Sequence, residues 1–284
     1  MSRCVVLRPM LKTNLLPAIG FLAISALPAT AQVAQQQSGG PVTDSGGWII
    51  TLKANAVSGP KYPGSADQGF IAYPSGSIRR AGTTPGFSAP DDGLGFALYE
   101  TAVFKIGPVL RYQAGRYSGG NAELRGIHDA RWALEPGVFA EIWAVPEILR
   151  ARFEIRRGFH GHEGVVGNFG LDLVQRFGNL TLSGGPRVAL GDKDYMRSYF
   201  GVTAQDAAWN RRVTAYNPNG GVKGYGAAAA ASYKFNESWS TTVQAGYERL
   251  QGDAAKSPIV KSFGKRDQIT LGASLSYSFS WKGF

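Results

Sequence analysis

Apolar and polar residues alternate without interruption in residues 269–281, near the C-terminal end of the chain. Every second residue is apolar, and those between are serine, threonine or glycine. Successive side chains of a strand point to opposite faces, so one face of this segment is wholly apolar. At about 3.3 Å per residue, the segment is long enough to cross a bilayer at a tilt. The pattern predicts a membrane-spanning strand of an outer-membrane β-barrel.

Three aromatic residues end the apolar face of this segment: Tyr277, Phe279 and Trp281. Aromatic side chains gather where a barrel wall meets the membrane surface. We therefore expect these residues to form part of an aromatic girdle. Either this face or Phe284 would be the signal that the outer-membrane assembly machinery recognises.

Further alternating segments predict the rest of an all-β, antiparallel barrel. They are residues 48–56, 70–80, 94–99, 104–116, 132–143, 147–157, 165–176, 180–190, 222–235, 239–250 and 268–281. Bacterial barrels have an even strand number, short periplasmic turns and long extracellular loops. We therefore predict twelve strands, with the extra one at residues 83–89, although Pro85 and Pro90 disfavour it. Ten strands are expected if this region is a folded loop.

The N-terminal residues predict export. Arg3, Arg8 and Lys12 precede a short apolar run, and residues 29–31 read Ala-Thr-Ala, a signal-peptidase cleavage pattern. We expect a signal peptide at residues 1–31, removed after Ala31, a flexible periplasmic lead at residues 32–47 and a barrel at residues 48–284. The predicted location is the outer membrane of a Gram-negative cell.

Composition narrows the partners and the chemistry. Cys4 is the only cysteine and lies in the predicted signal peptide, so the mature chain has no disulfide or cysteine metal site. The formal charge of +10 includes three signal-peptide cations, which leaves +7 for the mature chain. Such a charge favours anionic partners, above all the phosphates of lipopolysaccharide. Outer-membrane lipid is the expected environment, and no nucleic-acid partner is expected.

The inward-facing positions of the central strands are unusually rich in charge. Opposite charges on facing strand positions attract each other, so we predict an ion-pair ladder in the lumen. Such a ladder could fill and stiffen a narrow barrel, or form a basic constriction that selects anionic solutes. The predicted ladder consists of Glu135, Glu141, Arg150, Arg152, Glu154, Arg156, Asp172 and Arg187.

Several loop motifs resemble one family over essentially the whole mature chain. The motif residues are Tyr62, Pro63, Gly64, Ser65, Tyr195, Tyr199, Phe200, Gly201, Ser257 and Pro258. Together they resemble the MipA/OmpV family of MltA-interacting outer-membrane proteins. The resemblance implies an outer-membrane barrel. It also implies a scaffold that links a lytic transglycosylase to a peptidoglycan synthase, although other relatives resemble porins.

Catalytic candidates are few. His128 and Asp129 with Ser118 could contribute to a hydrolase triad, and His160 and His162 could ligate a metal. Any histidine beside an aspartate would look like the first set, and a loop-tip position explains the second more simply, as solvated polar residues. We therefore predict no catalytic residues, metal or cofactor. A non-enzymatic scaffold is the first function expected, a channel for small anionic solutes the second, and an enzyme acting on lipid A or another envelope substrate the third.

The longest predicted loop, residues 191–221, is unusually aromatic, with Tyr195, Tyr199, Phe200 and Trp209. Loops of this length are often functional. This loop could fold inward as a plug, outward as a binding surface, or pack its aromatics against the barrel rim.

Overall fold

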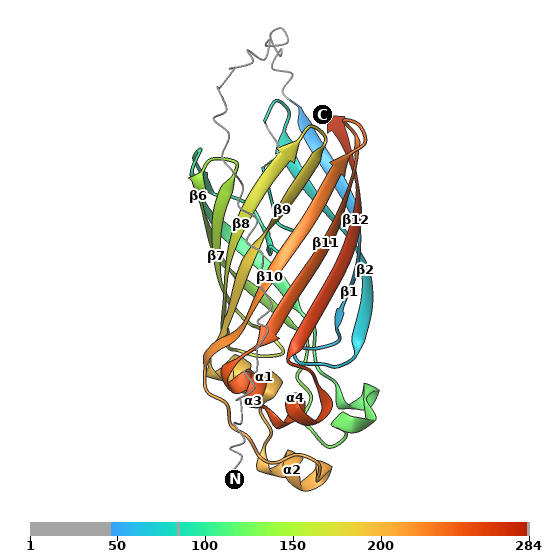
Figure 1. Cartoon of the computed structure of the whole chain (residues 1–284), viewed down its shortest axis with the longest axis vertical. Helices are drawn as coiled ribbons and strands as arrows, with labels where there is room; N and C mark the ends of the chain where they lie inside the picture. The colour runs from blue at the N-terminus through green and yellow to red at the C-terminus, as the bar shows by residue number, and fades with distance from the viewer. Residues whose placement is uncertain (1–46, 84–85, 283–284) are drawn as a thin grey trace, which may run out of the picture. The chain divides into compact units, whose positions relative to one another are not determined.

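The computed structural model describes residues 47–83 and 86–282, which form a curled antiparallel sheet of twelve strands (Figure 1). Ten strands of nine residues or more make the wall, and two more have two residues each. The long strands are β1 (Trp48–Pro60), β2 (Gln68–Arg80), β5 (Phe104–Gln113), β6 (Ala133–Val145), β7 (Leu149–Arg157), β8 (Val165–Phe177), β9 (Leu180–Gly191), β10 (Gly221–Lys234), β11 (Trp239–Leu250) and β12 (Asp267–Trp281). The short ones are β3 (Leu94–Gly95) and β4 (Tyr99–Glu100).

Strand pairing brings the first and last strands of the barrel together. β1 pairs with β12 from Trp48 opposite Trp281 to Ser58 opposite Leu271, and its other edge pairs with β2. From β12 the sheet continues through β11, β10, β9, β8, β7 and β6 to β5 and β3. Among the described residues no ladder joins β2 to β3.

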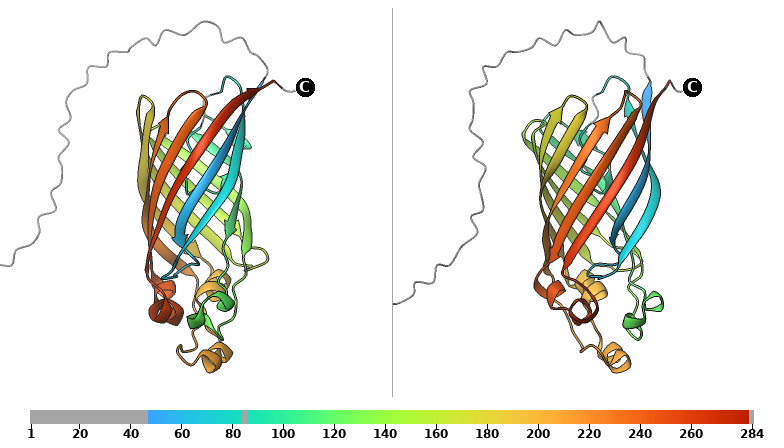
Figure 2. Two further views of the ribbon diagram at one scale, coloured as in Figure 1. Left: turned by 90° about the vertical axis from the view of Figure 1, so that its right-hand side faces the viewer. Right: turned by 45° about the vertical axis from the view of Figure 1, so that its right-hand side comes forward.

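The connections at the two ends of the barrel differ in length. Residues 146–148, 178–179 and 235–238 connect strands tightly at one end, whereas residues 192–220 and 251–266 form long connections at the other. The long connections carry helices α1 (Lys193–Phe200), α2 (Ala204–Asn210), α3 (Gly252–Lys256) and α4 (Pro258–Phe263), which lie together below the strands in Figures 1 and 2. Since outer-membrane barrels have short periplasmic turns and long extracellular loops, the helical end is extracellular, and the predicted barrel design is confirmed. No helix in the described ranges is long and apolar enough to cross a bilayer.

Side-chain exposure follows the alternation of the sequence. On β12, Leu271 and Leu275 are 55% and 46% exposed, whereas Gln268 and Ser276 are 6% and 7% exposed. The apolar face therefore points outward to lipid and the hydroxyl face points into the lumen. At the periplasmic end of the outward face, the ring of Tyr277 lies 4.8 Å from that of Trp239 and 6.0 Å from that of Phe279. Along this strand, the alternation seen in the sequence therefore matches the exposure of the side chains in the structure.

The prediction of an extra strand at residues 83–89 is wrong. Residues 83 and 86–89 form no strand. The chain instead turns into the lumen, and the strands that follow, β3 and β4, pair with β5. Pro90 has no N–H to give a ladder, and the next two residues, Asp91 and Asp92, would be costly on a lipid-facing wall. We call residues 86–93 the inward segment, because they run through the inside of the barrel and do not form a strand of its wall. The even strand number is met by β3 and β4, into which the predicted strand at residues 94–99 is broken.

The two chain termini lie largely outside the described residues. The predicted signal peptide at residues 1–31 and nearly all of the lead at residues 32–47 fall there, as does Phe284. The signal peptide, the lead and the role of Phe284 stay predictions.

Candidate functional site

A buried arginine is the centre of the charged network in the lumen. Arg150 lies on β7, and its side chain is 0% exposed. Its guanidinium donates to Glu141 Oε2 at 3.0 Å, to Asp172 Oδ2 at 3.1 Å and to Asp92 Oδ2 at 2.5 Å. Strand register explains two of these contacts, because Asp172 stands directly opposite Arg150 on β8 and Glu141 lies diagonally from it on β6. A buried charge is tolerated only when it is paired and hydrogen-bonded, and Arg150 is paired on three sides.

The rest of the predicted ladder extends this network along β6 to β9. Arg152 contacts Glu141 at 3.4 Å and Glu154 at 2.9 Å. Arg156 pairs with Glu135 at 3.1 Å and also with Glu154. The structure thus brings all of the predicted ladder residues into one connected set, with Arg187 joined through Asp172 at 2.6 Å.

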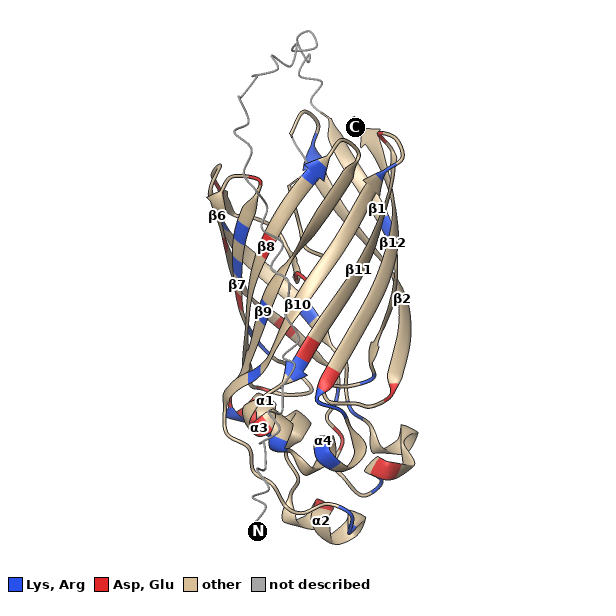
Figure 3. Ribbon diagram, in the orientation of Figure 1, with Lys and Arg blue, Asp and Glu red and all other residues tan. Residues whose placement is uncertain are grey.

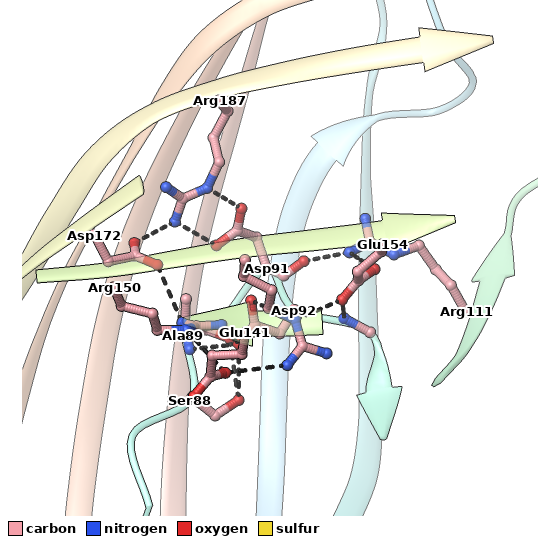
Figure 4. Close-up of polar contacts among 12 residues, drawn as sticks. Ser88, Ala89, Asp91, Asp92, Arg111, Glu141, Arg150, Glu154, Asp172 and Arg187 are labelled. Atoms are coloured by element: carbon pink, nitrogen blue, oxygen red, sulfur yellow. Dashed lines mark hydrogen bonds and ion pairs between the residues drawn. The ribbon is translucent and has the colours of Figure 1, made fainter. Parts of the chain in front are cut away.

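The inward segment supplies two carboxylates that sequence reasoning missed (Figure 4). Asp91 accepts from Arg187 Nε at 2.7 Å and from its Nη2 at 3.1 Å, and Asp92 accepts from Arg150. The amide of Gly93 donates to Glu154 Oε1 at 3.0 Å. A Pro-Asp-Asp sequence between strands is an ordinary turn signal, so nothing local indicated that it enters the lumen.

A cavity of about 530 Å³ lies beside the network. Its opposite wall comes from β10 to β12 and consists largely of small residues, among them Gly226, Ala228 and Gly246. Figure 3 shows that charges on β10 to β12 are confined to the strand ends. The acidic lining residues are Asp91, Asp92, Glu154, Asp172 and Glu248, and the basic ones are Arg111, Arg152, Arg187 and Lys223. The lining is therefore charge-compensated and not a basic constriction.

The family-motif residues meet in the extracellular cap, which we define as residues 61–67, 114–132, 192–220 and 251–266. Tyr62 is buried with Ile259 and Phe263. Ser257 Oγ donates to the carbonyl oxygen of Phe200 at 2.7 Å. Gly64 has φ +89°, and a Cβ there would lie 2.7 Å from a methyl carbon of Val260. Motifs far apart in sequence thus form one packed unit.

Gln268 ties this unit to the barrel. Its Oε1 accepts from the amide of Gly64 at 3.1 Å, and its Nε2 donates to the carbonyl of Ser65 at 3.2 Å. Because Gln268 is the first inward-facing residue of β12, these bonds fix the cap to the rim.

Comparison with known proteins identifies the family to which these motifs belong. Residues 52–279 match the family model described as MltA-interacting protein MipA. The chain belongs to this family. Outer membrane protein OmpV of Vibrio cholerae serotype O1 is 35% identical over 92 residues, which cover 32% of this chain and 34% of OmpV. The alignment therefore spans about a third of that relative.

Solved outer-membrane proteins also resemble this MipA-family chain. The COG4313 outer membrane channel from Pseudomonas putida F1 is 10% identical, with a TM-score of 0.42, covering 82% of this chain and 96% of its own. The NanC porin is 8% identical, with a TM-score of 0.40, covering 80% of this chain and 98% of its own.

In this MipA-family member, helix α1 packs its aromatics against the barrel rim. Tyr195, Tyr199 and Phe200 are at most 2% exposed and lie in one cluster with Val166 of β8. Burial raises the pKa of both tyrosine hydroxyls, which keeps them neutral. Trp209 at the end of α2 is instead 67% exposed. Of the three arrangements open for this loop, packing on the rim describes its α1 part.

The expectation that the histidines at 160 and 162 are solvated loop residues is wrong for His162, whereas His160 is exposed as expected. His162 is 4% exposed, and its Nε2 lies 3.0 Å from Glu135 Oε1 at the extracellular end of the ladder. His160 lies with its ring 4.3 Å from that of Trp132. Tertiary packing of α1 over the rim covers His162, whose ring meets Tyr195 edge-on at 5.1 Å. In the part of the chain that the structure describes, no group of three or more His, Cys, Asp or Glu residues is placed to hold a metal.

The candidate hydrolase residues form two separate contacts. Ser118 Oγ donates to Asp129 at 2.8 Å, whereas His128 Nδ1 lies 2.6 Å from Asp206 Oδ2. Burial would raise the pKa of Asp206, but hydrogen bonds from His128 and from the Thr203 amide outweigh it and lower that pKa. These contacts join the cap loops and do not assemble a serine–histidine pair.

Proposed function

We propose that this outer-membrane barrel passes small polar solutes through a narrow lumen and performs no chemistry on them. The cavity of about 530 Å³ between the inward segment and the small-residue wall carries this proposal. Sites for small molecules are of the order of 300–1,000 Å³. An inward-folded segment that narrows a hydrophilic lumen is also a direct way to restrict solute size.

The charges of the lumen change the expected selectivity. Because Asp91 and Asp92 enter the network, the cavity lining has no excess of arginine and lysine. A ring of uncompensated basic side chains would favour anions as a class. We therefore expect the channel to show only a weak preference between anions and cations. Selection among solutes would depend on individual lining side chains.

Single-channel conductance of the refolded protein in a planar bilayer tests this function. Steps of small, steady conductance are expected from the wild type. Ala228 faces the lumen and its neighbour Ala229 faces lipid, so Ala228→Trp should reduce the conductance by at least about half, since lumenal substitutions tune passage. Ala229→Trp is the matched control and should leave it unchanged. A folded wild type that is silent, or equal effects of the two variants, would overturn the proposal.

A second candidate function is attachment of peptidoglycan-remodelling proteins to the outer membrane. The family description, MltA-interacting protein, favours it. The periplasmic connections are short, so a lytic transglycosylase or a peptidoglycan synthase would have to bind the barrel rim or the predicted lead at residues 32–47. Pull-down of both enzymes with the full mature chain, and with residues 32–47 deleted, tests this role. Capture that survives the deletion would assign binding to the rim, and no capture by either form would remove this candidate.

A further inference from the structure

The two carboxylates of the inward segment are held in different ways. The side chain of Asp92 is 11% exposed, and its main partner, Arg150, is 0% exposed. The side chain of Asp91 is 43% exposed and lines the cavity, and its partner Arg187 is 18% exposed. The ion pair of Asp92 with Arg150 is thus buried and holds the inward segment in place, whereas the ion pair of Asp91 with Arg187 is accessible from the cavity.

Arg187 holds Asp91 in the geometry that a free carboxylate would adopt. Its Nε and Nη2 donate to the two different oxygens of Asp91, at 2.7 and 3.1 Å. A guanidinium presents this planar fork to carboxylates in preference to other groups. Arg111 also donates through Nη2 to the backbone oxygen of Asp91. The Asp91 carboxylate therefore occupies a carboxylate-binding fork that faces the cavity.

We propose that the lumen binds small solutes that carry a carboxylate, and that the solute carboxylate displaces Asp91 from Arg187. The proposal deepens the proposed function, on which it rests for the route by which the solute enters. Exchange of one carboxylate for another conserves the number of charge-assisted hydrogen bonds on Arg187. Asp172 keeps its own bond to Arg187 at 2.6 Å, and Asp92 keeps the segment attached.

The rest of the cavity defines the remainder of the solute. The wall that faces the fork contains Gly226, Ala228 and Gly246, which leave room for a body without charge. Gln244 and Thr270 in the same lining can hydrogen-bond polar groups on that body. A bulky or strongly charged body would contact the Lys223–Glu248 ion pair, whose charged atoms lie 3.1 Å apart. Because these two residues already neutralise each other, they offer no partner for a further charge. The favoured class is a monocarboxylate of about amino-acid size with a neutral polar body.

Calorimetric titration of the folded protein in detergent micelles with N-acetylglycine tests the exchange. Asp91→Asn removes the carboxylate that competes with the solute and leaves Arg187 available. The apparent affinity of a site is reduced in proportion to the fraction of molecules in which it is free. Binding to Asp91→Asn should therefore be at least about tenfold tighter than to the wild type. Glu237→Gln removes the same charge from an exposed periplasmic turn and should leave the affinity unchanged. Arg187→Gln should abolish binding, and so should replacing the probe by its neutral amide, N-acetylglycinamide.

The outcomes separate this proposal from the proposed function. No gain of affinity in Asp91→Asn, or equal binding of the acid and its amide, would overturn the exchange. Equal binding of inorganic phosphate would also overturn it, because the fork would then recognise anions in general. A silent bilayer with carboxylate binding retained would remove the channel function and keep the site. Conductance that N-acetylglycine leaves unaltered, together with no titration signal, would remove the site and keep the channel.

Discussion

Replacing Arg150 by methionine should destabilise the barrel more than any other single change to the ladder. The side chain is fully buried, and methionine conserves much of its volume while removing the charge. Arg150 makes three charge-assisted hydrogen bonds, and each is worth about 1.5–3 kcal/mol. Their gross value of about 5–9 kcal/mol is an upper bound on the loss.

The surviving ion pairs reduce the expected cost. Asp92 and Glu141 each keep a contact with Arg152, at 3.5 and 3.4 Å, and Asp172 keeps its contact with Arg187 at 2.6 Å. Breaking a buried pair by removing one partner costs about 3–5 kcal/mol. We therefore expect Arg150→Met to lower the free energy of unfolding by about 3 kcal/mol, at the lower end of this range.

Urea unfolding of the protein folded into lipid vesicles, followed by tryptophan fluorescence, measures this loss. Arg157→Met is the matched control, because Arg157 lies on the same strand but is exposed at its extracellular end. The control should stay within about 0.5 kcal/mol of the wild type. A loss below about 1 kcal/mol in Arg150→Met, with an unchanged denaturant slope, would refute the view that this network is a sealed structural element.

Three further predictions concern the cap and the wall. Since the folded-state pKa of Asp206 is depressed, its contribution to cap stability is complete above the ordinary value of 3.8 and is lost as the pH falls through the lower folded value. Amide-exchange protection in α2 should therefore drop in the wild type as the pH falls below about 4, and be low already at neutral pH in Asp206→Asn. Gly64→Ala, which places a Cβ at a positive φ against the cap core, should cost about 1–3 kcal/mol and make the cap sensitive to limited proteolysis with the barrel intact. Val243→Arg, on the lipid face near the middle of β11, should cost about 2–4 kcal/mol in vesicle unfolding, whereas Thr242→Arg, which faces the lumen, should cost far less.

The wall of the barrel could be predicted from the sequence because its causes are local. A strand in lipid must hydrogen-bond its whole backbone and put an apolar side chain outward at every second position. Residues 269–281 satisfy this rule without exception, and the same two-residue period placed Arg150 and Asp172 in the lumen. Strand register then set opposite charges against each other, so most of the ladder followed from the sequence.

The interior of the barrel was decided by contacts between residues far apart in the chain. Asp91 meets Arg187 across 96 residues, and Gly64 meets Gln268 across 204. Neither contact could be recognised from a periodic pattern in the sequence, because one partner in each pair lies in an irregular segment. The path of such a segment depends on the space that the folded barrel wall leaves for it. The same holds for His162, which is buried only because α1 folds over it. The sequence by itself determined which residues form the wall and which face the lumen, whereas only the tertiary structure decided how that lumen is filled, because an irregular segment enters it where buried charges offer partners.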